Sequence, residues 1–152
     1  YETMNINNKN TAQFEIIKLG LFNEKKTLSI NDTANLGTNL INAVNATSTI
    51  EVTDLDSIVN EKQINVGFIK ADLEGAMYKA LIGMKNTIKK YRPILSFAIY
   101  HSPEEFFLTK PLLEKITENL NYKIEIDCHF SSPYHIFGLI IWAYPKELAI
   151  VD

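Results

Sequence analysis

The sequence predicts an α/β fold in which most strands are parallel and the last two form an antiparallel hairpin. The apolar run Val66–Ile69 comes shortly before acidic residues and an amphipathic helical pattern, as in a strand followed by a helix. A second, nearly all-apolar run, Ile94–Tyr100, follows that helix and completes a β-α-β unit, whose strands are parallel. Near the end, Tyr122–Phe130 alternates apolar and polar residues and Phe137–Tyr144 is continuously apolar, which favours an antiparallel pair.

Composition and charge favour one water-soluble domain over residues 1–152. The chain is 46% hydrophobic and 11% aromatic, enough for a single core. Its net charge is -3 and its basic residues form no stripe, so nucleic acid is not an expected partner. No apolar run reaches the roughly 18 residues of a membrane span. Cys128 is the single cysteine; we expect it to be buried, and its isolation favours a reducing, cytoplasmic location.

The pattern of residue types in the first fifty residues predicts a hairpin and then a loop. Gln13–Phe22 is rich in strand formers and Lys26–Ile30 alternates apolar and polar residues, so we expect the two to pair. Residues 31–49 are rich in Asn and Thr with weak periodicity, which predicts a flexible loop. Because the chain opens at Tyr1 on a polar stretch, we also expect it to be a fragment.

Residues 50–90 predict a strand and a helix, then another strand and helix. Ile50–Val52 is extended, and Asp54 or Asp56 can cap a short helix ending near Asn60. Val66–Lys70 reads as an inner parallel strand. It feeds a helix from Glu74 to about Lys90, ended by Pro93, whose buried face is formed by Met77, Leu81, Met84 and Ile88.

A third helix follows the strand Ile94–Tyr100. Ser102, Pro103 and Glu105 have the spacing of a capping box with proline at the first helical position. Its predicted buried residues are Leu112, Leu113, Ile116 and Leu120. Since parallel strands end at one edge of a sheet, His101 is expected at the same edge as Asp72, and in α/β proteins ligands bind at such an edge.

The final hairpin raises the question of a metal site. Asp127, His129 and His135 flank the turn Ser131–Tyr134, and their composition would suit a metal ion. Exposed histidines in turns are the commoner arrangement. We therefore predict no metal site from the sequence.

The block Ile69–Ala76, which reads Ile-Lys-Ala-Asp-Leu-Glu-Gly-Ala, resembles the FkbM-type S-adenosylmethionine-dependent methyltransferases. The resemblance covers about residues 13–146, only the second half of that family's domain. It also includes, in the family's order, Leu55-Asp56-Ser57, Leu81-Ile82-Gly83, Arg92-Pro93, Ile99–Glu104 and Tyr144-Pro145-Lys146.

This resemblance implies a partial Rossmann-like methyltransferase sheet and an enzyme that methylates an oxygen of a small molecule or glycan. It also implies S-adenosyl-L-methionine as cofactor, held in the family by a glycine-rich turn. The six glycines here form no Gly-x-Gly turn. We therefore expect S-adenosyl-L-methionine to bind tightly only to a more complete protein, and this chain alone to be inactive.

Asp72 and His101 are the predicted catalytic residues. Methyl transfer to a hydroxyl needs in-line positioning and often a base. A carboxylate at the strand's end suits that edge, although Asp72 could equally cap the following helix. An imidazole suits proton abstraction near neutral pH, although His101 could instead anchor backbone.

Glu74, Gly75 and Asp56 are predicted to lie near the substrate or cofactor. Glu74 could instead complement the dipole of the helix that it begins, and Asp56 could cap a helix.

An interaction or oligomerisation module is the competing hypothesis. A half-sheet exposes a strand edge that invites pairing, so a homo-oligomer is plausible. We expect a partner subunit, or a rearrangement near Gln13, to cover that edge.

Overall fold

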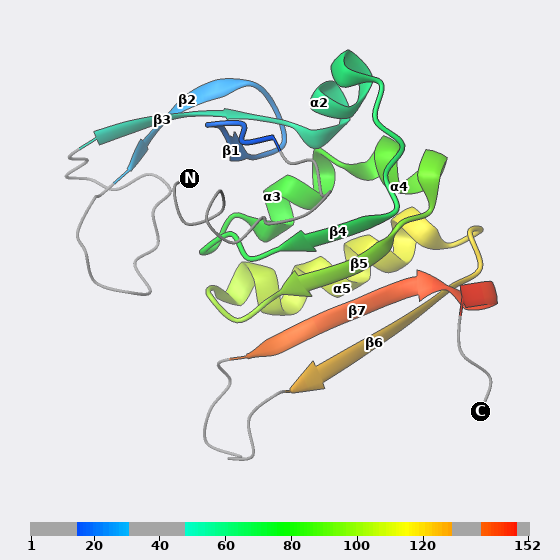
Figure 1. Ribbon diagram of the computed structural model, residues 1–152. Helices are drawn as coiled ribbons and strands as arrows, with labels where there is room; N and C mark the ends of the chain where they lie inside the picture. The colour runs from blue at the N-terminus through cyan, green and yellow to red at the C-terminus, as the bar shows by residue number, and fades with distance from the viewer. Residues whose placement is uncertain (1–14, 31–47, 129–137, 149–152) are drawn as a thin grey trace, which may run out of the picture.

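The computed structural model describes residues 15–30, 48–128 and 138–148, which form two sheets and four α-helices. Figure 1 shows the smaller sheet, β1–β3–β2, above the larger one, β4–β5–β7–β6, with α5 running behind β5. The strands are β1 (Gly20–Leu21), β2 (Lys26–Ile30), β3 (Ser48–Thr53), β4 (Phe68–Ala71), β5 (Ile94–Ala98), β6 (Tyr122–Cys128) and β7 (Leu139–Pro145). The helices are α2 (Leu55–Lys62), α3 (Met77–Ile82), α4 (Lys85–Tyr91) and α5 (Pro103–Thr117), followed by a 3-10 turn (Lys146–Leu148).

The core lies between the four-stranded sheet and α3, α4 and α5. Strand positions two residues apart face these helices because side chains alternate across a strand. In β5, for example, Leu95 and Phe97 are fully buried beside Ile141 and Ala143 of β7. The helices contribute the predicted stripe, Met77, Leu81, Met84 and Ile88, together with Leu113 and Ile116.

Strand pairing confirms the β-α-β unit and the final hairpin. β4 and β5 are parallel, with Phe68 opposite Ile94, and β6 and β7 are antiparallel over seven residue pairs. The prediction of a mostly parallel sheet is wrong. Among the described residues, β1–β3 and β4–β5 are parallel, whereas β2–β3, β5–β7 and β6–β7 are antiparallel.

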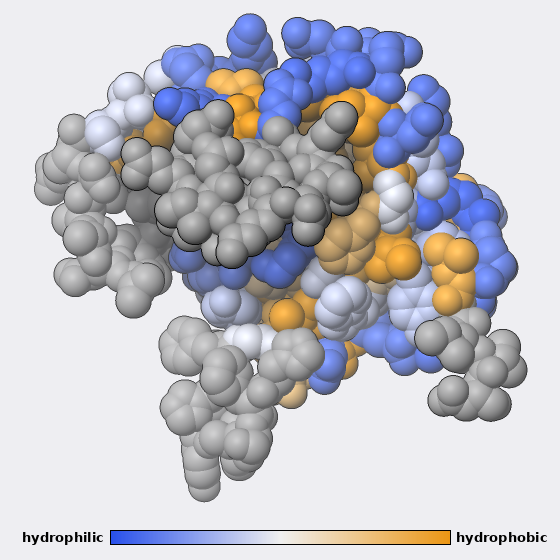
Figure 2. Space-filling view, viewed as in Figure 1, coloured by the Kyte–Doolittle hydropathy of each residue, from blue (hydrophilic) through white to orange (hydrophobic). Residues whose placement is uncertain are grey.

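β4 lies at the edge of the described sheet, so the prediction of an inner strand there is wrong for this part of the chain. The side chain of Phe68, at the start of β4, is 53% exposed. Hydrophobic residues are also visible on the face of the molecule that is turned to the viewer in Figure 2. Of the residues predicted to cover this edge, Gln13 lies outside the described ranges.

The N-terminal hairpin prediction is wrong. β1 and β2 do not pair with each other, because the longer β3 lies between them and takes β1 in parallel and β2 in antiparallel. Most of the predicted loop, 31–47, is outside the described residues, and its last two positions, Ser48 and Thr49, already belong to β3.

The helix predicted over Glu74–Lys90 is two helices. α3 ends at Ile82 and α4 begins at Lys85, because the chain turns at Gly83 to pass against the backbone of Phe22. A Cβ on Gly83 would lie 2.2 Å from the carbonyl oxygen of Phe22, so this contact needs glycine.

The starts of α2 and α5 agree with the positions predicted from the sequence. Asp54 caps α2 by accepting from Ser57 N–H at 2.7 Å, and α2 extends two residues beyond the predicted end at Asn60. Ser102 caps α5 with Pro103 at its first position.

Cys128 is exposed, which contradicts the predicted burial. It lies at the end of the edge strand β6, where the side chains from Glu125 onward are all exposed. In the described residues no helix is long and apolar enough to cross a membrane.

Candidate functional site

The ends of β4 and β5 bring the two predicted catalytic residues together. β4 ends at Ala71 and β5 at Ala98, and because the strands are parallel their following residues share one rim of the sheet. Nε2 of His101 lies 3.3 Å from Oδ1 of Asp72 and 3.5 Å from Oε2 of Glu74. We call Asp72, Glu74, His101 and the nearby Glu105 the carboxylate–imidazole cluster.

The loop between β4 and α3 aims Glu74 at His101. Glu74 has φ 48° and Gly75 has φ 102°, so two successive residues adopt backbone conformations that side chains disfavour. α3 begins only at Met77, and its cap residue Ala76 makes no side-chain hydrogen bond. The alternative roles are therefore wrong: Asp72 is not the cap of this helix, and Glu74 is not in its first turn.

Glu105 organises the cluster from within the core. Its side chain is fully buried, yet both carboxylate oxygens have partners: Met77 N–H donates to Oε1 at 2.9 Å and His101 N–H to Oε2 at 3.1 Å. Oε2 also lies 3.4 Å from Nδ1 of His101. Glu105 thus joins α5, the start of α3 and the chain after β5, and holds the backbone of His101 in place.

The sequence predicts Glu105 only as a member of a capping box. Ser102 Oγ does accept from Glu105 N–H at 3.1 Å, as that motif requires. The carboxylate, however, turns inward to other amides. A glutamate directly before the exposed pair Phe106 and Phe107 gives no sequence signal for such burial.

The imidazole of His101 is held between the two sides of the cluster. Its side chain is 9% exposed, whereas those of Asp72 and Glu74 are 42% and 48% exposed. Nδ1 faces the buried Glu105 and Nε2 faces the two solvent-accessible carboxylates. Among the described residues, the ion pairs of Asp72 and Glu74 are with His101 alone.

Tyr100 borders the cluster. Its ring lies 4.1 Å from that of His101, centroid to centroid. Burial raises the pKa of the Tyr100 hydroxyl, and the negative charges of Asp72, Glu74 and Glu105 raise it further. The phenol therefore stays protonated and can donate a hydrogen bond.

An apolar pocket adjoins His101. It is lined by Tyr100, His101, Ser102, Pro103, Phe106 and Phe107. Phe106 and Phe107 meet edge to face at 4.9 Å and are 42% and 67% exposed. The aromatic faces can contact a flat or ring-shaped molecule. The neighbouring carboxylates can accept hydrogen bonds from the hydroxyl groups of that molecule.

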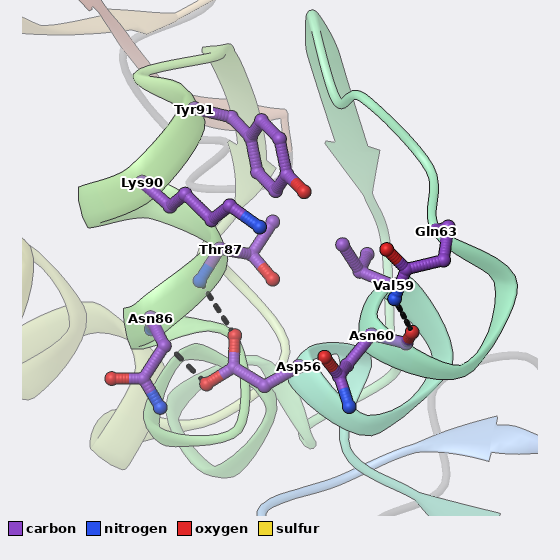
Figure 3. A pocket seen from close by; sticks show the side chains of 8 residues that line it. All are labelled: Asp56, Val59, Asn60, Gln63, Asn86, Thr87, Lys90 and Tyr91. Atoms are coloured by element: carbon purple, nitrogen blue, oxygen red, sulfur yellow. Dashed lines mark hydrogen bonds between the residues drawn. The ribbon is translucent and has the colours of Figure 1, made fainter.

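Asp56 has a structural task. Its Oδ1 accepts from Thr87 N–H at 2.7 Å and its Oδ2 from Asn86 N–H at 3.0 Å, so it caps α4 from α2. Figure 3 shows both bonds, in a pocket that Lys90 and Tyr91 also line. Asp56 therefore has the capping role that was the alternative to a functional one. The helix that it caps is α4, whereas Asp56 itself lies in the first turn of α2.

Of the residues considered for a metal site at the final hairpin, His129 and His135 lie outside the described ranges. Asp127 is described and exposed on β6. A different set, Asp72, Glu74 and His101, places one ligand atom each within 4.8 Å of one another. The sequence predicts Asp72 and His101 as catalytic residues and Glu74 as a contact to substrate or cofactor, and it does not predict that the three form a metal site.

Comparison with known proteins identifies a family. A family model described as "Methyltransferase FkbM domain" matches residues 1–124. Among solved structures, the chain is similar to the crystal structure of Methyltransferase FkbM from Methylobacillus flagellatus KT, with a TM-score of 0.60 and 19% identity. That match covers 83% of this chain and 27% of the other, so the chain spans about a quarter of its length. No curated protein matches the chain.

Proposed function

Because the chain belongs to the FkbM methyltransferase domain family, we propose that it forms part of a methyltransferase that uses S-adenosyl-L-methionine and methylates an oxygen of a small molecule or glycan. The observation that supports this most is the approach of His101 Nε2 to within 3.3 Å of Asp72 at the shared ends of β4 and β5. Ligands bind at this edge in open α/β sheets.

Asp72 and His101 are the proposed catalytic residues. His101 Nε2 would accept the proton of an acceptor hydroxyl placed beside it. S-adenosyl-L-methionine would supply the methyl group and would be left as the neutral thioether S-adenosylhomocysteine. Asp72 stabilises the imidazolium that this transfer creates. Glu105, behind Nδ1, holds the ring in the required orientation.

Glu74 and Gly75 are proposed to contact the acceptor or cofactor, because their loop lies beside His101 and Glu74 is half exposed. Asp56 is a weaker candidate, since both of its oxygens already accept backbone hydrogen bonds. The acceptor's apolar part would occupy the pocket formed with Phe106 and Phe107.

Cofactor binding is proposed for a more complete protein. The glycines of this chain provide no Gly-x-Gly turn, so the methionine and ribose portions of S-adenosyl-L-methionine need residues beyond those present here. A cytoplasmic location is part of the same proposal and follows from the single cysteine.

An interaction module is the second candidate, and the free edge of β4 favours it. Within the described sheet, β4 pairs with β5 alone, and an unpaired strand edge is a site for adding another strand. Pairing with a second chain would give this chain a homo-oligomeric role without catalysis.

Two measurements separate the candidates. Calorimetric titration with S-adenosylhomocysteine should give weak or no binding to this chain and clear binding to the complete protein. The complete protein, given S-adenosyl-L-methionine with a labelled methyl group and hydroxylated acceptors, should place the label in an ether that resists mild alkali. A complete protein that binds no S-adenosylhomocysteine would refute the enzyme proposal.

A further inference from the structure

The carboxylate–imidazole cluster has the donor atoms and spacing of a metal site. Asp72, Glu74 and His101 each present one ligand atom, and the three atoms lie within 4.8 Å of one another. Donors bound to one ion at about 2.0 to 2.2 Å lie roughly 3 to 4.4 Å apart across the coordination sphere. The two separations from His101 Nε2, 3.3 and 3.5 Å, fall in that range. The two carboxylates lie within 4.8 Å of each other, so a small inward movement of these exposed side chains would complete the site.

The imidazole gives a second reason, independent of the acidic residues. The His101 side chain is nine-tenths buried, and its Nδ1 is buried without a hydrogen bond that satisfies both distance and angle. Its other nitrogen points at the two exposed carboxylates. A histidine that only supported the fold would be expected to use a ring nitrogen for a backbone or side-chain hydrogen bond.

Glu105 supplies the outer layer that metal-binding histidines commonly have. A ligating imidazole usually directs its second N–H at a carboxylate, which fixes the tautomer and the ring. Glu105 Oε2 lies 3.4 Å from Nδ1, and two backbone amides hold that carboxylate in position. A small rotation of the ring would close this hydrogen bond while keeping Nε2 toward Asp72.

We propose that Asp72, Glu74 and His101 bind one divalent first-row transition ion, with Glu105 as the positioning residue for His101. The mixed set of two carboxylates and one imidazole suits Mn²⁺ or Zn²⁺. Because Asp72 and Glu74 are nearly half exposed, the remaining coordination positions face solvent and are open to water or an acceptor hydroxyl.

This site changes how the proposed reaction would remove its proton. With the ion held, His101 would be a ligand and not the base. The ion would lower the pKa of a bound hydroxyl, whose proton would pass to solvent water at this exposed edge. Ion binding itself does not rest on methyl transfer. It therefore can be tested, and can fail, without the cofactor or the acceptor.

The experiment titrates this 152-residue chain with Mn²⁺ and follows the loss of the free-ion signal by electron paramagnetic resonance, with Zn²⁺ followed by calorimetry in parallel. We expect one ion per chain. Asp72→Asn should weaken binding at least about 10-fold, because it removes an exposed ligand without disturbing the core. Glu104→Gln is the matched control: it removes an equally exposed carboxylate, paired with Lys79 at 3.3 Å, and should leave affinity unchanged.

Glu105→Gln and His101→Ala complete the test. Glu105→Gln should weaken binding about 10-fold to 100-fold and shift the visible spectrum of Co²⁺ bound at the site, a change that loss of packing alone would not cause. His101→Ala should abolish saturable binding, with circular dichroism confirming the fold. Absence of saturable binding in the unsubstituted chain, or equal affinity in Asp72→Asn and Glu104→Gln, would overturn the proposal.

Discussion

Two groups of acidic side chains in this molecule serve different ends. At the α2–α4 junction, Asp54 and Asp56 direct their oxygens at backbone amides that a helix start leaves unpaired. At the rim of β4 and β5, Asp72 and Glu74 face solvent and one imidazole. The first group stabilises the fold, and the second leaves its negative charge available to a ligand.

The largest loss of stability is expected from a substitution at Gly83, where the α2–α4 junction is packed against the backbone of Phe22. Gly83→Ala should lower the free energy of unfolding by about 3 kcal/mol, since the new methyl group would lie 2.2 Å from Phe22 O and 2.9 Å from Asp54 Cβ. Chemical denaturation measures this loss. Gly67→Ala is the control, because nothing lies within 4 Å of its added Cβ, and it should change stability little. Equal losses of stability for the two substitutions would contradict the claim that the packing at Gly83 requires glycine.

The contrast between the two acidic groups is tested by matched alanine substitutions. Asp56→Ala should cost about 2 kcal/mol of unfolding free energy, because it leaves two amides at the start of α4 without a partner. Asp72→Ala should change stability by less than about 0.5 kcal/mol, as for an exposed side chain. Thermal and denaturant unfolding would report both, and a larger loss for Asp72 would reverse the assignment of roles.

The loop that follows β4 at the rim requires glycine at position 75. Gly75→Ala should destabilise the protein by about 1.5 kcal/mol, because φ 102° is unfavourable for a side chain. The same substitution should weaken Mn²⁺ binding by displacing Glu74. If Gly75→Ala leaves both stability and ion binding unaltered, the loop does not hold Glu74 in place.

The smallest effect concerns an exposed pair outside both groups. Arg92 donates to Glu147 at 2.5 Å and lowers the pKa of that carboxyl below its usual value. Its contribution is complete above the unfolded pKa and is lost as pH falls through the folded value. Relative to the unsubstituted protein, Glu147→Gln should therefore be slightly less stable at neutral pH and indistinguishable in strong acid. Denaturant midpoints across pH 2 to 7 provide the test.

Local patterns in the sequence predicted the rim well. The apolar runs at β4 and β5, with a helical segment between them, predict parallel strands, and this pairing brings Asp72 and His101 to the same rim. Ser102 and Pro103 mark the start of α5 by chemistry that acts within one turn. These features depend on neighbours in sequence, so one chain suffices to find them.

Features set by distant contacts were missed. The break at Gly83 depends on Phe22, about sixty residues earlier, and nothing near Gly83 in the sequence signals it. The position of β3 between β1 and β2 depends on pairing between strands that are distant in the sequence, and the burial of Glu105 depends on Met77. The exposure of Cys128 follows from β6 being an edge strand, which alternation alone cannot show.

The most direct test of the central claim compares turnover with stability for Asp72→Asn in the complete protein. Methyl transfer from labelled S-adenosyl-L-methionine and the free energy of unfolding are measured on the same preparation. We expect the transfer rate to fall at least about 100-fold while stability changes by less than about 0.5 kcal/mol. An unchanged rate would contradict the claim that this exposed carboxylate serves the reaction.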